Sequence, residues 1–165
     1  MPRKASAAMR PEEIGGLGRE VSPLVAGLET CLSNSFVLMM KSQACHWNVT
    51  GPLFSSIHAL TQVHYEDLFT AIDDIAERVR ALDHPAPKSL ADMIGMATIT
   101  ELPGPQSTEA MVAALQKDHH SVAKQMRSVV QTAETASDSV SADLMTARIA
   151  FHEKAAWMLG AILSK

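Results

Sequence analysis

Two long segments on either side of Gly51-Pro52 carry apolar residues at alternating steps of three and four. The stripe in the second segment consists of Leu68, Ile72, Ile75, Val79 and Leu82. The stripe in the first segment consists of Leu24, Leu28, Cys31, Leu32, Ser35, Phe36 and Met39. This spacing is typical of helices that bury one face in a bundle core. Because the link is short, helices at about 22–49 and 55–82 should be antiparallel neighbours.

The rest of the chain predicts two more long helices after an extended connection. Residues 83–107 contain four prolines and one short amphipathic segment, 90–98, which Ser89 and Asp92 would cap. Helices follow at about 108–133 and 142–163, with a polar break at 137–141 between them. An all-α, four-helix bundle with one long crossover between its second and third helices has ferritin-like topology. The expected fold therefore includes a short helix within that crossover.

Composition supports a helical, cytoplasmic protein with one structured domain. The chain has 165 residues, of which 47% are apolar but only 4% aromatic, and it contains ten methionines. No run is expected to span a membrane, and residues 1–20 are expected to form a flexible tail before a domain at 21–165. Ser22 would cap the first helix. Cys31 and Cys45 lie about 21 Å apart along one predicted helix, too far for a disulfide between them.

Two histidines and two carboxylates form the candidate metal-binding set. His46 and His58 flank the Gly51-Pro52 turn at similar heights, while Asp73 and Glu77 follow on the second helix. Imidazole and carboxylate together suit iron and similar transition metals. His58 and Asp73 are separated by about 22 Å of helix, so one ion cannot bind both within one chain. An antiparallel pair of these helices would form two shared sites, related by a two-fold axis near Glu66.

Asp73 and Glu77 also repel each other unless a cation lies between them, because they are four residues apart on one helix. By contrast, Asp74 is followed four residues later by Arg78, which is the favourable arrangement of an exposed ion pair. The pattern therefore favours a metal-binding role for Asp73 and Glu77 over a simply solvated helix face.

The segment HWNVTGP from His46, followed by His58, Asp73 and Glu77 at these offsets, resembles the Dps miniferritins. The resemblance implies an oxidoreductase, a ferroxidase with its iron site between subunits. It further implies oxidation of Fe(II), preferably by hydrogen peroxide and otherwise by oxygen. Ferric oxide would be stored in a hollow dodecamer of two-fold dimers, protecting DNA from oxidative damage. Zinc is a competing ion, and Trp47 resembles the tryptophan at the border of the family's site.

Other polar residues are candidates for accessory roles. Many family members have an acidic residue one turn after the second histidine, where this chain has Gln62, so binding of a second iron is open. Glu66, His64 and His152 are alternative accessory ligands, with surface or core roles as the default. The resemblance places Asp138 and Asp143 at an acidic pore for iron entry; as an alternative, they would stabilise a helix start.

Two other functions compete with ferroxidation. An in-bundle di-iron site needs Glu-x-x-His pairs, and no Glu in this sequence is followed by His three residues later. The second alternative is a DNA-compacting protein with a vestigial or zinc-occupied metal site, associated with the nucleoid. Little in the sequence supports it: the tail holds the cations Arg3, Lys4 and Arg10 but also Glu12 and Glu13, and the formal net charge is −4.

Overall fold

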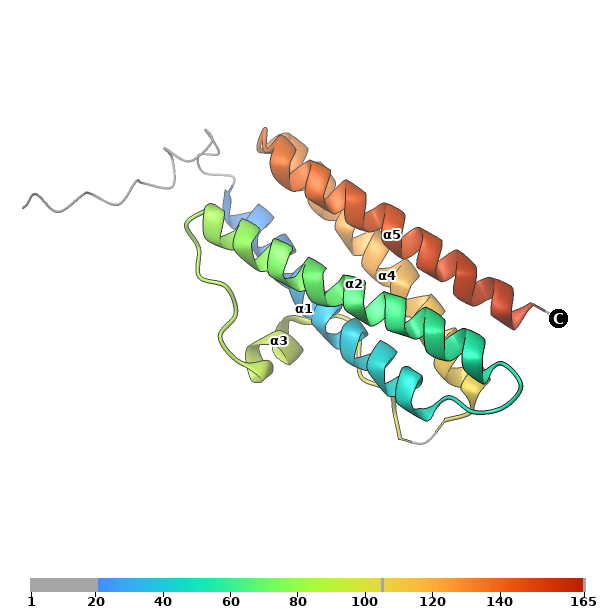
Figure 1. Ribbon diagram of the computed structural model, residues 1–165. Coiled ribbons are helices and arrows are strands. Elements are labelled where there is room, and N and C mark those ends of the chain that lie inside the picture. The colour runs from blue at the N-terminus through green and yellow to red at the C-terminus, as the bar shows by residue number, and fades with distance from the viewer. Residues whose placement is uncertain (1–20, 105, 165) are drawn as a thin grey trace, which may run out of the picture.

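The computed structural model describes residues 21–104 and 106–164, and this part of the chain contains helices and no strands. Figure 1 shows the helices, which are α1 (Val21–Asn48), α2 (Phe54–Ala81), α3 (Leu90–Met96), α4 (Thr108–Thr135) and α5 (Ser139–Leu163). The all-α expectation is confirmed, as is the short helix in the crossover. The expected tail, residues 1–20, lies outside the described residues, as does the side chain of Ser22.

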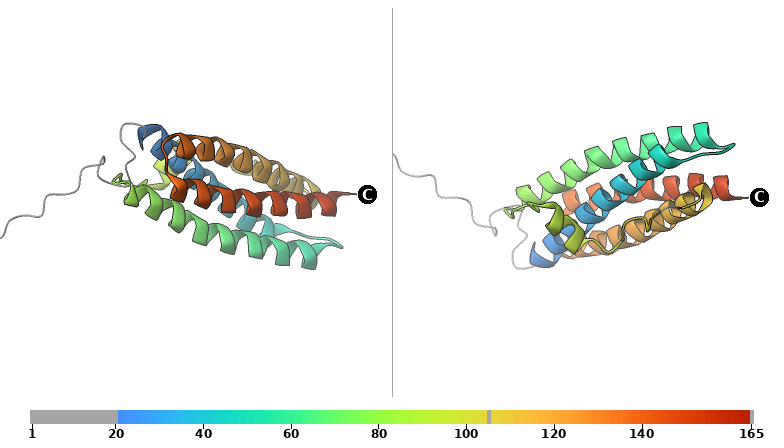
Figure 2. Two further views of the ribbon diagram at one scale, coloured as in Figure 1. Left: turned by 90° about the horizontal axis from the view of Figure 1, so that it is seen from above. Right: turned by 90° about the horizontal axis from the view of Figure 1, so that it is seen from below.

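The four long helices form a bundle of two antiparallel hairpins. The first hairpin is α1 with α2, the second is α4 with α5, and α1 packs on α4 to join them (Figure 1). The short helix α3 lies against α1, outside the bundle (Figure 2). The apolar stripes predicted from the sequence meet between the helices. The largest fully buried side chains are Leu24, Leu28, Leu32, Leu38, Ile57, Leu68, Ile75, Leu82, Leu115, Met126, Met145 and Leu159.

The turn between α1 and α2 depends on Gly51. Its φ of 93° lies in the left-handed region, where a residue with a Cβ is strained. The Phe54 N–H donates to the Gly51 carbonyl at 3.0 Å and starts the next helix. This tight reversal places the end of α1 beside the start of α2.

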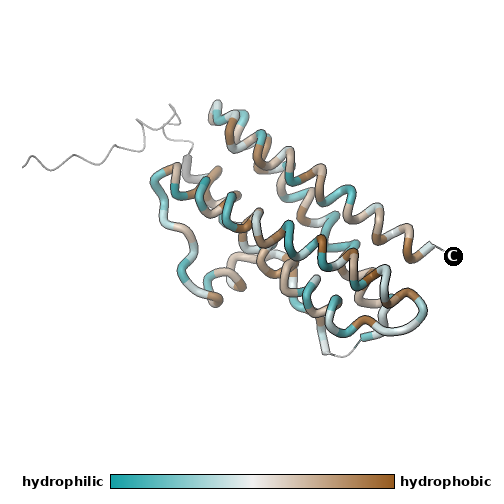
Figure 3. Tube along the Cα trace, in the orientation of Figure 1, coloured by the Kyte–Doolittle hydropathy of each residue, from teal (hydrophilic) through white to brown (hydrophobic). Residues whose placement is uncertain are grey.

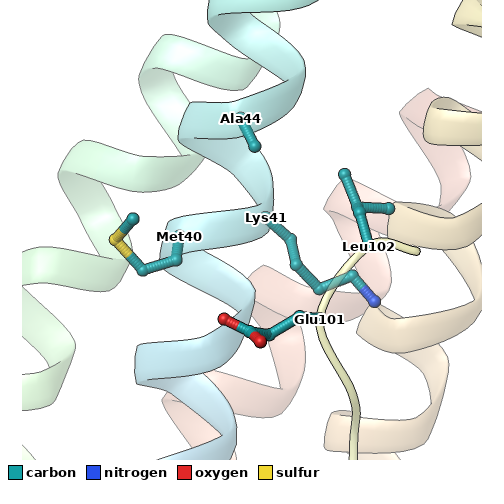
Figure 4. A pocket seen from close by; sticks show the side chains of 5 residues that line it. All are labelled: Met40, Lys41, Ala44, Glu101 and Leu102. Carbon is teal, nitrogen blue, oxygen red and sulfur yellow. The ribbon is translucent and has the colours of Figure 1, made fainter. Parts of the chain in front are cut away.

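Two polar side chains of α1 fasten the crossover to the bundle. The Asn34 carboxamide oxygen accepts hydrogen bonds from the backbone N–H groups of Thr98, at 2.7 Å, and Ile99, at 3.3 Å. The Lys41 ammonium donates to the Thr100 carbonyl at 2.7 Å and forms an ion pair with Asp118 of α4. Figure 4 shows the Lys41 side chain reaching from α1 to the crossover near Leu102. These bonds hold the long crossover against α1, although only a short part of the crossover is helical.

The start of α5 differs from the sequence prediction. The helix begins at Ser139 and not at Ala142, because Asp138 caps it: the Ser141 N–H donates to the Asp138 carboxylate at 3.1 Å. The expected polar break at 137–141 therefore shrinks to three residues, 136–138. The Ser89 cap of α3 is confirmed, since its hydroxyl accepts from the Asp92 N–H at 3.1 Å.

Helix α1 corrects another expectation. The stretch Pro23–Asn48 is long and apolar enough to cross a membrane, against the expectation that no segment would be. However, 61% of its most apolar window is buried inside the structure. It also buries polar side chains, including Asn34 and Lys41, and Figure 3 shows polar and apolar stretches alternating along the helices. These features are typical of a core helix. Cys31 and Cys45 are both buried and free, as expected.

Candidate metal centre

His46 near the end of α1 and His58 in the first turns of α2 lie face to face. Their ring centroids are 3.6 Å apart, and the ring planes are inclined by 18°. The Gly51 turn produces this contact by bringing the two helix ends together. The prediction that both histidines share one surface is confirmed in this respect.

The two histidines also exchange hydrogen bonds. His46 Nδ1 lies 2.8 Å from the His58 carbonyl, and His58 Nδ1 lies 2.8 Å from the His46 carbonyl. A carbonyl only accepts, so each Nδ1 must carry the proton. In a neutral ring, Nε2 then has the free lone pair. Both imidazoles are thus held in the tautomer that binds a metal through Nε2.

Aromatic side chains surround the histidine pair. Phe54 stacks on His58 with 5.0 Å between ring centroids, and Tyr65 presents an edge to His46 at 5.3 Å. Trp47, next to His46, is 64% exposed. These contacts restrict ring motion on the protein side of the pair, while Trp47 projects from the isolated chain.

The two carboxylates lie far from the histidines of their own chain. α2 is continuous from Phe54 to Ala81, so His58 and Asp73 are separated by about 22 Å along its axis. Asp73 and Glu77 are both exposed. Within the described residues of one chain, no group of three His, Cys, Asp or Glu side chains is arranged to hold a metal ion.

An apolar groove between α1 and α2 lies between the histidine end and the carboxylate end. One part is lined by Met39, Gln43, Tyr65, Glu66 and Phe69. The adjoining part is lined by Phe36, Met39, Phe69, Ile72, Asp73 and Ala76. Phe69, shared by both parts, is 69% exposed. A contiguous exposed apolar surface of this kind is typical of a contact site.

Comparison with known proteins assigns the family. The ferritin-like domain model matches residues 25–165. An uncharacterized low temperature-induced protein from Nostoc is 38% identical over 78% of this chain and 73% of its own length. A DNA protection during starvation protein from Bacillus anthracis is 30% identical over 78% of this chain and 88% of its own. The chain belongs to the Dps family.

Solved structures agree with this assignment. Dps from Thermosynechococcus elongatus is 27% identical, with a TM-score of 0.87, covering 92% of this chain and 96% of that one. Dps from Vibrio cholerae is 28% identical, with a TM-score of 0.83, covering 88% and 91%. The Vibrio protein is described as a member of the ferritin-like diiron-carboxylate superfamily. The ferritin-like fold and Dps membership predicted from the sequence are confirmed.

Gln62 and Glu66, the accessory candidates of this Dps chain, form a pair on the exposed face of α2. The Gln62 amide donates to the Glu66 carboxylate at 2.8 Å. This bond orients a carboxylate oxygen beside the expected two-fold axis. The role of either residue in binding a second iron stays a prediction.

His64 and His152, by contrast, lie inside the bundle and not with His46 and His58. They join His119, which the sequence analysis missed, in a cluster formed by α2, α4 and α5. His119 is fully buried and follows the core spacing of Leu115 and Val122. That spacing marked position 119 as interior, but the convergence of three helices could not be read from it.

The Asp138 carboxylate already has partners within its own chain, which favours the helix-start alternative over the pore role. Its carboxylate caps α5 and pairs with Arg78 at 2.7 Å, and only 3% of the side chain is exposed. Burial alone would raise its pKa, but hydrogen bonds from Arg78 and Ser141 hold the pKa below its ordinary value. Asp143 is exposed, and its place in an iron-entry pore stays a prediction.

Proposed function

We propose that this Dps protein oxidises Fe(II) at sites shared between two subunits and stores the ferric product. His46 and His58 of one subunit would bind the ion together with Asp73 and Glu77 of the other. The observation that carries this proposal is the reciprocal hydrogen bonding of His46 and His58, which leaves the Nε2 lone pair of each neutral ring free for a ligand. The descriptions of two similar proteins support the same class of function. The Bacillus anthracis relative is named for DNA protection, and the Vibrio cholerae structure is described as a member of the diiron-carboxylate superfamily.

The apolar groove supports a second copy of this chain as the occupant. It adjoins Glu66 and includes Asp73 in its lining, so an antiparallel partner would cover Phe69 and bring its histidine pair to Asp73 and Glu77. Burial of about 150 to 250 Å² for each aromatic side chain favours such a contact. The symmetric dimer would hold two sites, and twelve subunits would form the storage shell.

The proposed reaction needs charge compensation and electron transfer, without a covalent nucleophile. Asp73 and Glu77 would offset the cation's charge, while the two imidazoles would fix its position. Each Fe(II) gives up one electron. One hydrogen peroxide molecule accepts one electron from each of two Fe(II) ions, its O–O bond breaks, and the peroxide becomes two hydroxide ions while two Fe(III) ions form. Removal of iron and peroxide together would protect DNA without requiring contact with it.

Subunit complementation tests the shared site. One variant combines His46→Ala with His58→Ala, and the other combines Asp73→Ala with Glu77→Ala. Each alone should oxidise Fe(II) at background rate, followed by absorbance after anaerobic loading and addition of peroxide. In a mixed dimer, one of the two sites receives intact histidines from one subunit and intact carboxylates from the other, so activity should partly return.

Differently tagged subunits and tandem purification would establish that mixed dimers are present. Background activity in those dimers would show that the four ligands do not meet across the interface. The DNA-compaction alternative gives a different result: salt-dependent retention on DNA without iron oxidation by the unmodified chain.

A further inference from the structure

Three buried histidines meet inside the bundle, away from the His46 and His58 pair. His64 of α2 is 2% exposed, and His119 of α4 and His152 of α5 are fully buried. The ring centroid of His119 lies 5.1 Å from that of His64 and 5.1 Å from that of His152. Each histidine comes from a different helix, so the cluster depends on the assembled bundle.

The hydrogen bonding of the cluster is incomplete. His119 Nδ1 and His152 Nδ1 lie 2.9 Å apart, so one proton is shared between two ring nitrogens. Among the described residues, no group pairs with His119 Nε2, His152 Nε2 or His64 Nδ1, all of which are buried. Buried polar atoms without partners are costly and rare in native proteins.

The rings are also in the protonation state that a metal requires. Burial lowers the pKa of His64 to about 4 and that of His152 to about 3. Burial and the neighbouring histidines place the pKa of His119 well below its ordinary value. At neutral pH all three imidazoles are uncharged, so protons do not compete for the lone pairs. The adjacent ion pair of Arg148 with Asp67 has no net charge.

We propose that His64, His119 and His152 form a second, intrasubunit site for a transition-metal cation that prefers nitrogen ligands, such as Zn²⁺. The cation would bind His119 Nδ1 and His152 Nδ1, and the proton between them would move to the unpartnered Nε2 of its own ring. Two imidazole nitrogens at about 2.05 Å from a tetrahedral ion lie roughly 3.3 Å apart, so the 2.9 Å contact needs to open only slightly. As the described chain stands, the three rings are not arranged to hold an ion, so binding requires His64 to turn toward it as the third ligand.

The ligand set predicts selectivity. Three neutral imidazoles favour Zn²⁺, Cu²⁺ and Ni²⁺ over Mg²⁺, Ca²⁺ and Mn²⁺, which prefer oxygen. A three-histidine zinc site also leaves a fourth position open. This inference goes beyond the proposed ferroxidase and does not depend on it, because none of the three histidines belongs to the inter-subunit set.

Zinc binding to a full-length His46→Ala, His58→Ala background tests the proposal free of the other histidine pair. After chelator treatment, equilibrium dialysis against Zn²⁺ with a competing chelator should show one tightly bound ion per chain. Adding His119→Gln should weaken that binding at least about a hundredfold. Loss of a residue that only hydrogen-bonds a metal ligand already lowers metal affinity by up to about a hundredfold, and loss of the ligand itself should cost at least as much. Adding His120→Gln, the exposed neighbour on α4, should leave binding unchanged.

X-ray absorption of the zinc-loaded background provides a measurement that does not depend on the folding of a core variant. It should show about three imidazole ligands at roughly 2.0 Å. Absence of a tight ion in the background would overturn the proposal, as would imidazole-free coordination. Equal binding in folded His119→Gln and His120→Gln variants would also overturn it.

Discussion

His46 and His58 act as one unit at the scale of single residues. Each ring is held by the backbone carbonyl of the other, so neither histidine keeps its full orientation when the other is replaced. This coupling predicts that single and double substitutions have similar effects on metal binding, since the pair works as one ligand group.

Replacing His46 with alanine should reduce the initial rate of Fe(II) oxidation by at least about a hundredfold, because a direct ligand and the orientation of His58 are both lost. Stopped-flow absorbance after peroxide addition measures the rate, and light scattering checks that the assembly is unchanged. His84→Ala, in the crossover, is the matched control and should oxidise iron normally. A His46→Ala protein with the unmodified rate would place the oxidation site elsewhere.

The sequence could predict the proximity of these two histidines, because the Gly51-Pro52 turn and the helical spacing determine it. It could not predict the exchanged hydrogen bonds, since these depend on how closely two backbones approach. The carboxylate roles of Asp73 and Glu77 stay predictions, because their proposed partners belong to another copy of the chain.

At the scale of secondary-structure elements, the start of α5 depends on Asp138. The carboxylate accepts from the first turn of α5 and from Arg78 of α2, so it joins two helices. The sequence showed acidic residues near this helix start but placed the start three residues late, because Ser137–Ser141 reads as a loop. A side chain from a distant helix completes the cap, and local sequence does not contain that information.

Asp138→Ala should lower the free energy of unfolding by about 2 to 4 kcal/mol, because it removes a helix cap and leaves Arg78 without its partner. Asp143→Ala, exposed on the same helix, should change it by less than about 0.5 kcal/mol. Urea unfolding at neutral pH measures both. If Asp143 lines an iron-entry pore, its variant should nevertheless take up iron more slowly.

The stabilisation by Asp138 should also depend on pH. Its pKa is lower in the folded chain than in the unfolded chain, so the stabilisation is present above the unfolded pKa of about 4 and is lost as the pH falls through the folded value. The stability difference between Asp138→Ala and the unmodified protein should therefore shrink in strong acid. A difference that does not change with pH would contradict the ion pair.

At the scale of the whole molecule, the three buried histidines make bundle stability sensitive to acid. Their folded pKa values lie below the ordinary value of 6.5. The unfolded chain therefore binds protons that the folded chain does not as the pH falls below about 6.5. Each such histidine contributes a slope of up to about 1.4 kcal/mol per pH unit.

Metal-free protein should thus lose stability steadily from pH 6.5 toward pH 4, and His119→Gln should show a shallower loss. Urea unfolding in chelator at several pH values measures the slope, with His120→Gln as the control that retains it. Identical slopes in the two variants would mean that His119 titrates alike in the folded and unfolded chains.

The overall topology was predictable because helical spacing, the Gly-Pro turn and the proline-rich crossover are local features. The attachment of the crossover to α1 was not predictable, because Asn34 and Lys41 lie among apolar residues of α1 and their partners follow more than fifty positions later.

These two side chains also have a consequence for folding. If the hairpins form without docking, Lys41 and Asp118 lack each other and Asn34 lacks its backbone partners. A chain whose hairpins are only partly docked would bury apolar surface but leave these polar groups without hydrogen-bond or ion-pair partners. Such intermediates should therefore be sparsely populated, and the two hairpins should join in one cooperative step.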